Sequence, residues 1–387
     1  MHESKHEAYE LRGMLTTTYD SPYATPKIST ATGWKGFKSM ARILYGVMGD
    51  SRGHLSRSLS VAQAMEQHEF LFLGGGAVHD LKALGYTVED VPMLATYYRN
   101  TRLDLPGTVG NALRILCRKR HIVERVTRII KAFDPHLIIT DYEYFLPQAA
   151  RSLGLPCYSV DHQHVLTNCL FEPPSGQWLN RQITSFPIRH LYSAADKFLV
   201  SSFYQLPPKD PTRTEVYPPV LRRLVKQFHP RRDGHVLVYT SGGAYELLLS
   251  FLERIDMKFI IYGFGDRPPR RNLVFKKHSE QGFLEDLVGC LYVISNGGHS
   301  LISESLYYGK PVICFPIHFL YEQYLNGYFL EEYGYGKLCM DMKTGHSVIE
   351  RMGSEVDSFH KRIKNLSFWG NDLIAARLEA LMAAPRE

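Results

Sequence analysis

Apolar runs of strand length alternate with segments of helical periodicity along most of the chain after residue 40. Because strands joined through helices normally lie parallel in one sheet, this alternation predicts an α/β architecture with helices on both sheet faces. We expect strands at residues 41–48, 69–73, 86–91, 136–140, 158–160, 235–239, 258–262, 273–277, 291–294, 311–315 and 337–340. We expect helices at residues 55–66, 79–84, 109–133, 283–287, 300–308 and 372–383, and one more that ends at Phe251.

Residues 292–326 form one strand–turn–helix–strand unit. Its turn places Gly297 and Gly298 at the start of the helix predicted at 300–308. Free N–H groups and the positive end of the helix dipole favour an anion at such a start, and phosphate is the obvious candidate. Glu304 lies one turn into this helix. Its carboxylate is close enough to accept hydrogen bonds from the hydroxyls of a ribose attached to that phosphate.

Three polar residues follow the second strand of this unit. Glu322 and Gln323 are expected in a polar loop, with Asn326 shortly behind them. Together with Glu304 and the glycine turn, they predict a site for a nucleotide-diphosphate sugar. A double glycine before a helix also has a purely structural explanation, which is close packing of a strand on a helix.

Two further turns repeat the theme of a strand, small residues and a helix. Residues 49–54, Gly-Asp-Ser-Arg-Gly-His, follow the first strand, and residues 240–243 follow the first strand of the second half. Each turn is a potential anion site. We therefore expect backbone donors for a diphosphate at Gly53, Ser241, Gly242, Gly243, Gly298, His299 and Ser300.

Composition limits the class of protein. The 387 residues, 44% of them hydrophobic, can bury two ordinary cores. The net charge of +6 suits small anions or acidic lipid headgroups but is too dilute for a dedicated nucleic-acid binder. The six cysteines have no Cys-x-x-Cys spacing, and we interpret them as reduced core residues. Without a signal core or a bilayer-length apolar run, the expected location is cytoplasmic, with any membrane contact peripheral.

The segment 207–234 is crowded with proline and charge, and we expect the domain boundary there. Residues 40–206 would form an acceptor-side Rossmann-like domain and residues 235–355 a nucleotide-sugar-binding one. Residues 1–39 are expected to be a loose, disordered extension, with Met40 as a candidate functional start. Residues 356–387 are expected to be terminal helices.

The ordered series around Gly297 resembles the donor-binding signature of GT-B glycosyltransferases. That signature reads Gly-Gly-x-x-x-x-x-Glu, then Gly-Lys-Pro, Pro, Glu-Gln and Asn. The matching residues are Gly297, Gly298, Glu304, Gly309, Lys310, Pro311, Pro316, Glu322, Gln323 and Asn326. Residues 49–54 also resemble the first loop of the branch that holds the lipid II N-acetylglucosaminyltransferase, monogalactosyldiacylglycerol synthases and UDP-glucuronosyltransferases. His299 departs from the small residues usual there, and is expected to contact phosphate or change the donor preference.

The resemblance implies the GT-B fold, with two Rossmann-like domains across a cleft and terminal helices that return to the first domain. It implies a UDP-type donor, with Glu304 on the ribose, the 297–300 turn on the diphosphate, and Glu322 and Gln323 on the sugar. It also implies inversion at the anomeric carbon. A site that uses backbone donors for the diphosphate requires no metal ion. The Asp-x-Asp signature of metal-dependent transferases is absent from the sequence.

Such a reaction needs a base for the acceptor hydroxyl, and histidine titrates near the working pH. His54 is the leading candidate, although a role in capping the helix or binding phosphate stays open. Asp141 and Asp161 end predicted strands on the acceptor side and are alternative bases. Asp141 is also a candidate to orient a histidine. The cluster of Asp161, His162 and His164 lacks a further ligand at metal-binding spacing, so a metal site is not expected.

The predicted function is therefore that of an inverting hexosyltransferase, with a lipid, glycan or small molecule as acceptor. A nucleotide-sugar 2-epimerase, which needs no acceptor, and a non-catalytic nucleotide-sugar-binding subunit, which needs no base, are the alternatives. No cofactor beyond the donor and no nucleic-acid partner are expected. The basic side of the 109–133 helix is expected to be an ordinary solvated face, with an acidic lipid surface as the alternative.

Overall fold

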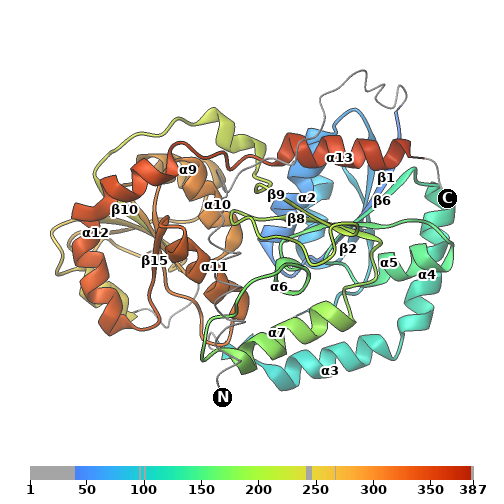
Figure 1. The fold of residues 1–387 in the computed structure, drawn as a ribbon, viewed down its shortest axis with the longest axis horizontal. Coiled ribbons are helices and arrows are strands. Elements are labelled where there is room, and N and C mark those ends of the chain that lie inside the picture. Colours follow the sequence, from blue (N-terminus) through green and yellow to red (C-terminus); the bar gives the residue numbers. More distant parts are fainter. Residues whose placement is uncertain (1–39, 96, 100–101, 241–245, 266, 385–387) are drawn as a thin grey trace, which may run out of the picture. The chain divides into compact units, whose positions relative to one another are not determined.

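Two parallel β-sheets form the framework of the protein (Figure 1). The computed structural model describes residues 40–95, 97–99, 102–240, 246–265 and 267–384. The strand order is β3-β2-β1-β6-β7-β8-β9 in the first sheet and β12-β11-β10-β13-β14-β15 in the second. All strand pairs within these two sheets are parallel. The α/β fold predicted from the sequence is therefore confirmed.

The strands of both sheets are short and separated by helices. The first sheet contains β1 (Arg42–Val47), β2 (Glu69–Gly74), β3 (Thr87–Asp90), β6 (Leu137–Asp141), β7 (Tyr158–Asp161), β8 (Lys197–Ser201) and β9 (Thr214–Tyr217). The second contains β10 (His235–Tyr239), β11 (Lys258–Tyr262), β12 (Leu273–Phe275), β13 (Val293–Ser295), β14 (Val312–Cys314) and β15 (Gly336–Leu338). A small antiparallel pair consists of β4 (Tyr98–Arg99) and β5 (Arg102–Leu103).

The helices between β1 and β9 are α2 (Arg52–Ala64), α3 (Leu105–Leu116), α4 (Lys119–Phe133), α5 (Phe145–Ser152), α6 (Val165–Asn168) and α7 (Trp178–His190). Those after β10 are α8 (Glu246–Leu252), α9 (Glu280–Gly289), α10 (His299–Tyr307), α11 (Tyr321–Glu332), α12 (Met342–Ile363) and α13 (Asn371–Ala383). The described residues also contain two 3-10 helices, η1 (Gly76–Leu84) and η2 (Arg223–Gln227).

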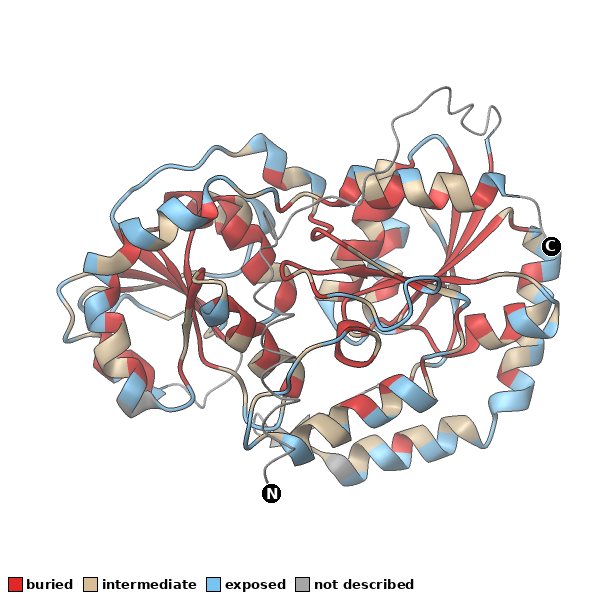
Figure 2. Ribbon diagram, viewed as in Figure 1, coloured by how far each residue is buried: buried red, intermediate tan, exposed pale blue. Residues whose placement is uncertain are grey.

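The first sheet buries apolar side chains on both of its faces. Successive residues of a strand point to opposite faces, so Ile43 and Leu44 of β1 join different core clusters. Ile43 packs in the cluster that includes Leu378 of α13, and Leu44 in the cluster that includes Val126 of α4. Figure 2 shows the buried strands between helices whose outer sides are exposed. This double coverage explains why the strands appear as continuous apolar runs in the sequence.

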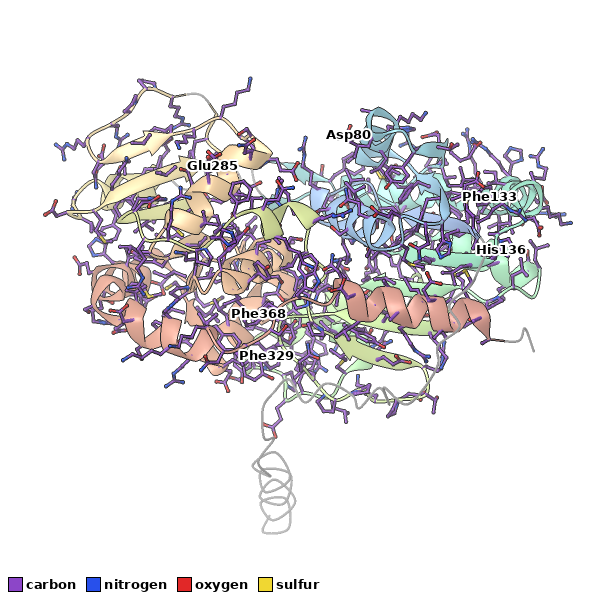
Figure 3. The ribbon with its side chains drawn as sticks, turned by 90° about the horizontal axis from the view of Figure 1, so that it is seen from above. Asp80, Phe133, His136, Glu285, Phe329 and Phe368 are labelled. Carbon is purple, nitrogen blue, oxygen red and sulfur yellow. The ribbon has the colours of Figure 1, made fainter. Side chains whose placement is uncertain are left out.

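The last helix, α13, returns to the first sheet after the chain has formed the second. It packs against α2, and Ile374 and Leu378 lie in the core of the first sheet. The Nε2 atom of His68, just beyond α2, lies 2.7 Å from Oε1 of Glu379 in α13. Phe368, labelled in Figure 3, precedes this helix and is buried against Tyr335.

The single helix expected at 109–133 is instead two helices, and that prediction was wrong. α3 ends at Leu116 and α4 begins at Lys119. Neither glycine nor proline occurs between them, and the apolar pattern continues across the break. Hydrophobic periodicity therefore cannot locate it.

A second correction concerns Glu322 and Gln323, which lie in the first turn of α11 and not in a loop. Tyr321, Leu325 and Phe329 are buried at four-residue spacing, which is a helical pattern. No element was expected at α6 or α7. The segment 207–234, which was expected to be a linker, contains β9 and η2. The extension expected at 1–39 lies outside the described residues.

Candidate active site

In each sheet, one helix begins near the point where the strand order reverses. In the first sheet β1 lies between β2 and β6, and α2 follows it. In the second sheet β13 adjoins β10, and α10 follows β13. Open parallel sheets bind ligands at such points. A Cβ atom built on Gly53 of α2 would lie 3.3 Å from Ser300 Oγ of α10. The positive ends of the two helices are therefore neighbours, which suits an anion with several charges.

The two glycines before α10 have different structural roles. Gly297 has a φ of 86°, which favours glycine, and an added Cβ would lie 2.5 Å from Cys314 Sγ. The same atom would lie 2.8 Å from the Gln323 carbonyl oxygen. Gly298 has no such neighbour, since nothing lies within 4 Å of its built Cβ. Gly297 is thus required by chain packing, whereas Gly298 leaves open space at the helix start.

His54 and Asp141 form a buried pair at the first of these helix starts. His54 lies in the first turn of α2, and its Nδ1 is 2.7 Å from Asp141 Oδ1 at the end of β6. The side chains are 8% and 0% exposed. The His54 ring stacks on Tyr142 with centroids 5.8 Å apart. His54 Nε2 has no hydrogen-bond partner among the described residues, so a neutral ring that donates from Nδ1 keeps Nε2 as an acceptor.

Arg57 binds the same carboxylate and was not identified from the sequence. Its Nε donates to Asp141 Oδ2 at 2.8 Å, and its Nη2 donates to Oδ1 at 2.7 Å. Burial lowers the pKa of His54, but the charge and hydrogen bond of Asp141 outweigh burial and raise that pKa above 6.5. The positive charge of Arg57 lowers the pKa of His54 and so opposes Asp141, because it disfavours a second cation beside it. The three-residue spacing of His54 and Arg57, which places both on one helix face, was the available signal.

Asp161 ends β7 and forms a second buried Asp–His pair. Its carboxylate accepts from the His164 backbone N–H at 2.9 Å, and Oδ2 is 2.6 Å from His164 Nδ1. The Ser159 hydroxyl donates to the same group. Although burial favours the neutral acid, His164 and these hydrogen bonds lower the pKa of Asp161 below its usual range. With its oxygens engaged in this way, Asp161 is less accessible to a ligand proton than His54 Nε2.

His162 connects the first sheet to the glycine turn of the second. Its Nε2 is 3.0 Å from Asn326 Oδ1, and its ring stacks on His299 with centroids 3.7 Å apart. Asn326 Nδ2 in turn donates to the Gly297 carbonyl at 3.0 Å. Asn326 has no exposed surface, and its amide stabilises the glycine turn. The contact with the nucleotide sugar that was expected for Asn326 stays a prediction. Burial and neighbouring positive charge hold the pKa of His299 well below its usual range, so that ring is neutral.

Aromatic side chains surround this connection. The Tyr204 hydroxyl also donates to Asn326 Oδ1, at 3.2 Å. The Tyr204 ring stacks on Phe329, which Figure 3 labels, with centroids 4.5 Å apart. Phe329 belongs to α11, the helix that carries Glu322 and Gln323. The polar link between the two halves is therefore shielded by apolar contacts.

Glu304, the predicted ribose ligand, is held by an arginine that the sequence analysis missed. Arg222 Nε donates to Glu304 Oε1 at 2.7 Å, and Nη2 donates to Oε2 at 2.6 Å. The two side chains are 18% and 5% exposed. A carboxylate offers about four acceptor positions, so this fork leaves positions for other donors. Arg222 lies in the segment expected to be a linker, and no sequence pattern relates it to Glu304.

The remaining predicted donor residues lie around the start of α11. Glu322 Oε2 accepts from Gln163 Nε2 at 3.3 Å, which brings Glu322 next to the residues that follow β7. Gln323 Oε1 accepts from the Ile317 backbone N–H at 3.0 Å, and its Nε2 has no partner among the described residues. The predicted donors Ser241, Gly242 and Gly243 lie outside the described residues.

Comparison with known proteins agrees with this geometry. The profile of the family described as "Glycosyl transferase family 1" matches residues 41–354. An "uncharacterized glycosyltransferase" of Methanosarcina acetivorans is 23% identical over 364 residues, which cover 86% of this chain and 95% of that protein.

Solved glycosyltransferase structures share the fold. Phytolacca americana UGT2, complexed with UDP-2fluoro-glucose and pterostilbene, matches with a TM-score of 0.65 at 15% identity, over 89% of this chain and 99% of that chain. Acinetobacter baumannii MurG matches with a TM-score of 0.57 at 13% identity, over 88% and 99%. The predicted GT-B fold is thus confirmed, while the narrower branch stays a prediction. Because the family profile spans most of the chain, the protein belongs to glycosyl transferase family 1.

Proposed function

We propose that the protein transfers a hexose from a UDP-sugar to a hydroxyl acceptor, with inversion at the anomeric carbon. The observation that supports this most is the buried His54–Asp141 pair beside the neighbouring starts of α2 and α10. The pair provides a base, and the helix starts provide N–H donors for a diphosphate. Both requirements of glycosyl transfer thus meet at one place.

In the proposed step the acceptor oxygen forms a bond to the anomeric carbon while His54 Nε2 takes its proton. The bond between that carbon and the diphosphate oxygen breaks, and the nucleoside diphosphate leaves with the electron pair. Asp141 keeps the proton of His54 on Nδ1 and stabilises the imidazolium that forms. The N–H groups at the start of α10 stabilise the charge on the leaving diphosphate. The proposed step uses no metal ion and no cofactor.

The donor would lie along α10 and the start of α11. We propose that Glu304 accepts from the ribose hydroxyls while the Arg222 fork fixes the orientation of its carboxylate. Glu322 and the Nε2 of Gln323 would bind the sugar. The UDP-sugar bound in the Phytolacca americana structure supports this choice of donor class.

His54→Gln tests the base. We expect kcat/KM to fall about 10²- to 10⁴-fold, because glutamine cannot take the proton, while the Kd for UDP is unchanged. UDP release from UDP-sugars should be measured with a panel of hydroxyl acceptors, and UDP binding by calorimetry. His79→Gln is the control, since His79 forms an exposed pair with Asp90. Full activity in the His54 variant would show that His54 is not the base.

The raised pKa of His54 predicts a particular pH dependence. Only the neutral ring can act as a base, so kcat/KM should decline toward low pH with a midpoint above 6.5. Asp141→Asn removes the carboxylate that raises this pKa, so the midpoint should move to lower pH. Circular dichroism at each pH would establish that the variant is folded. A midpoint at the same pH in both proteins would contradict the assigned pair.

Arg222→Met tests the orientation of Glu304. The substitution leaves a buried carboxylate unpaired, so we expect a loss of about 3 kcal/mol in the free energy of unfolding, measured by urea titration. UDP should also bind more weakly. Arg223→Met is the matched control. Arg223 pairs with Glu66, and the two side chains are 61% and 68% exposed. Such an exposed ion pair contributes less than about 1 kcal/mol to the free energy of unfolding. Tighter UDP binding to the Arg222 variant would mean that Arg222 competes with the ribose.

A further inference from the structure

Helix α7 exposes an apolar side that no described part of the chain covers. Trp178 is 70% exposed, Leu179 58%, Ile183 40% and Phe186 63%. Ser185 and Ile188, by contrast, are buried. In Figure 2 most of α7 is coloured as exposed or intermediate. The helix therefore directs more of its large apolar side chains outward than inward.

These four side chains lie on one side of the helix. With about 3.6 residues per turn, positions 178, 179, 183 and 186 fall within about 140° of arc. Arg189 and His190 are also exposed and fall on the same side. The outward side of α7 therefore carries four large apolar side chains, with Arg189 near its carboxyl end. Monomeric proteins rarely expose such a surface without a binding role.

The segment that contains α7 carries no acidic residue over a long stretch. From Pro173 to Ala195 the chain contains no aspartate or glutamate. Arg181 and Arg189 also act on Lys209, whose pKa is lowered by partial burial and by these two charges. Lys209 therefore adds a further positive charge near α7. An anionic surface is the complement of this arrangement.

We propose that α7 docks on an anionic lipid bilayer, with its apolar side inserted at the interface and its cations on the headgroups. Tryptophan and phenylalanine next to arginine are typical of helices that lie in a membrane surface. No helix among the described residues has the length and apolar character to cross a bilayer. Within the basic segment 109–133, α4 exposes no large apolar side chain in its described residues, which favours the interpretation of its basic side as a solvated face, whereas Val109 and Leu113 of α3 are 52% and 60% exposed.

Docking through α7 also indicates a class of acceptor, an inference that rests on the proposed glycosyl transfer. α7 packs against α11, whose first turn carries Glu322. A bilayer held by α7 would thus lie near the helix proposed to bind the donor sugar. We infer that the acceptor is an amphiphile whose hydroxyl group is presented at the membrane surface.

Co-sedimentation with lipid vesicles tests the docking without requiring activity. Vesicles of phosphatidylglycerol mixed with phosphatidylcholine should bind the full chain, and vesicles of phosphatidylcholine alone should bind it more weakly, with the difference reduced by salt. The double variant Trp178→Ser, Phe186→Ser should bind mixed vesicles about ten-fold or more weakly, because two large side chains no longer enter the bilayer. Leu247→Ser, at a 68% exposed leucine of α8, is the matched control and should bind normally.

Three results would overturn the proposal. The first is a wild-type protein that binds neither kind of vesicle, and the second is equal binding by the double variant. The third is a lipid-free dimer, measured by light scattering, that the double variant abolishes, since α7 would then be a contact between copies of the chain. UDP binding by the double variant should equal that of wild type. Failure of vesicle binding with UDP binding intact would reject the docking surface and leave the proposed transferase unaffected.

Discussion

The candidate site depends on one buried charge, the carboxylate of Asp141. A buried carboxylate is costly unless it is paired and hydrogen-bonded, and Asp141 has no exposed surface. His54, Arg57 and Ser58, all on α2, provide its partners. The start of α2 is therefore fixed against the end of β6, and the His54 ring is held with its Nε2 unpaired among the described residues. In this way the requirement to satisfy a single charge positions the proposed base.

In the second half of the site, too, single side chains have two structural roles. Asn326 holds the Gly297 carbonyl and also meets His162 from the first half, while Arg222 holds Glu304. The groups that shape the proposed donor site are thus also groups that connect the two sheets. We expect donor binding and the relative position of the two halves to influence each other, because neither can change without disturbing these contacts.

The sequence predicted those features that depend on local pattern. The parallel sheets followed from alternating elements, and Asp141 and Asp161 were placed at strand ends, where the structure has them. Lys310 of the matching Gly-Lys-Pro series is buried, and its ammonium group donates to the Arg231 and Cys290 carbonyls. Several of the features that were missed depend on tertiary contacts.

Arg222 illustrates this limit most clearly. It lies far from Glu304 in the sequence, in a segment whose prolines and charges predicted a linker, and only the fold brings the two side chains together. The break between α3 and α4 was missed because the apolar pattern continues across it. Helix α11 was missed for a different reason, since the spacing of Tyr321, Leu325 and Phe329 was present and was not used.

The central claim is that a nucleotide sugar binds at the start of α10, and calorimetric titration of UDP into wild type and Gly298→Val tests it most directly. The built Cβ of Gly298 meets nothing within 4 Å, so the chain itself has room for a side chain there. A diphosphate bound at the helix start would clash with that side chain. We predict that wild type binds UDP and that the variant, with a similar unfolding temperature, does not. Equal binding of UDP to both proteins, or no binding to wild type, would contradict the account.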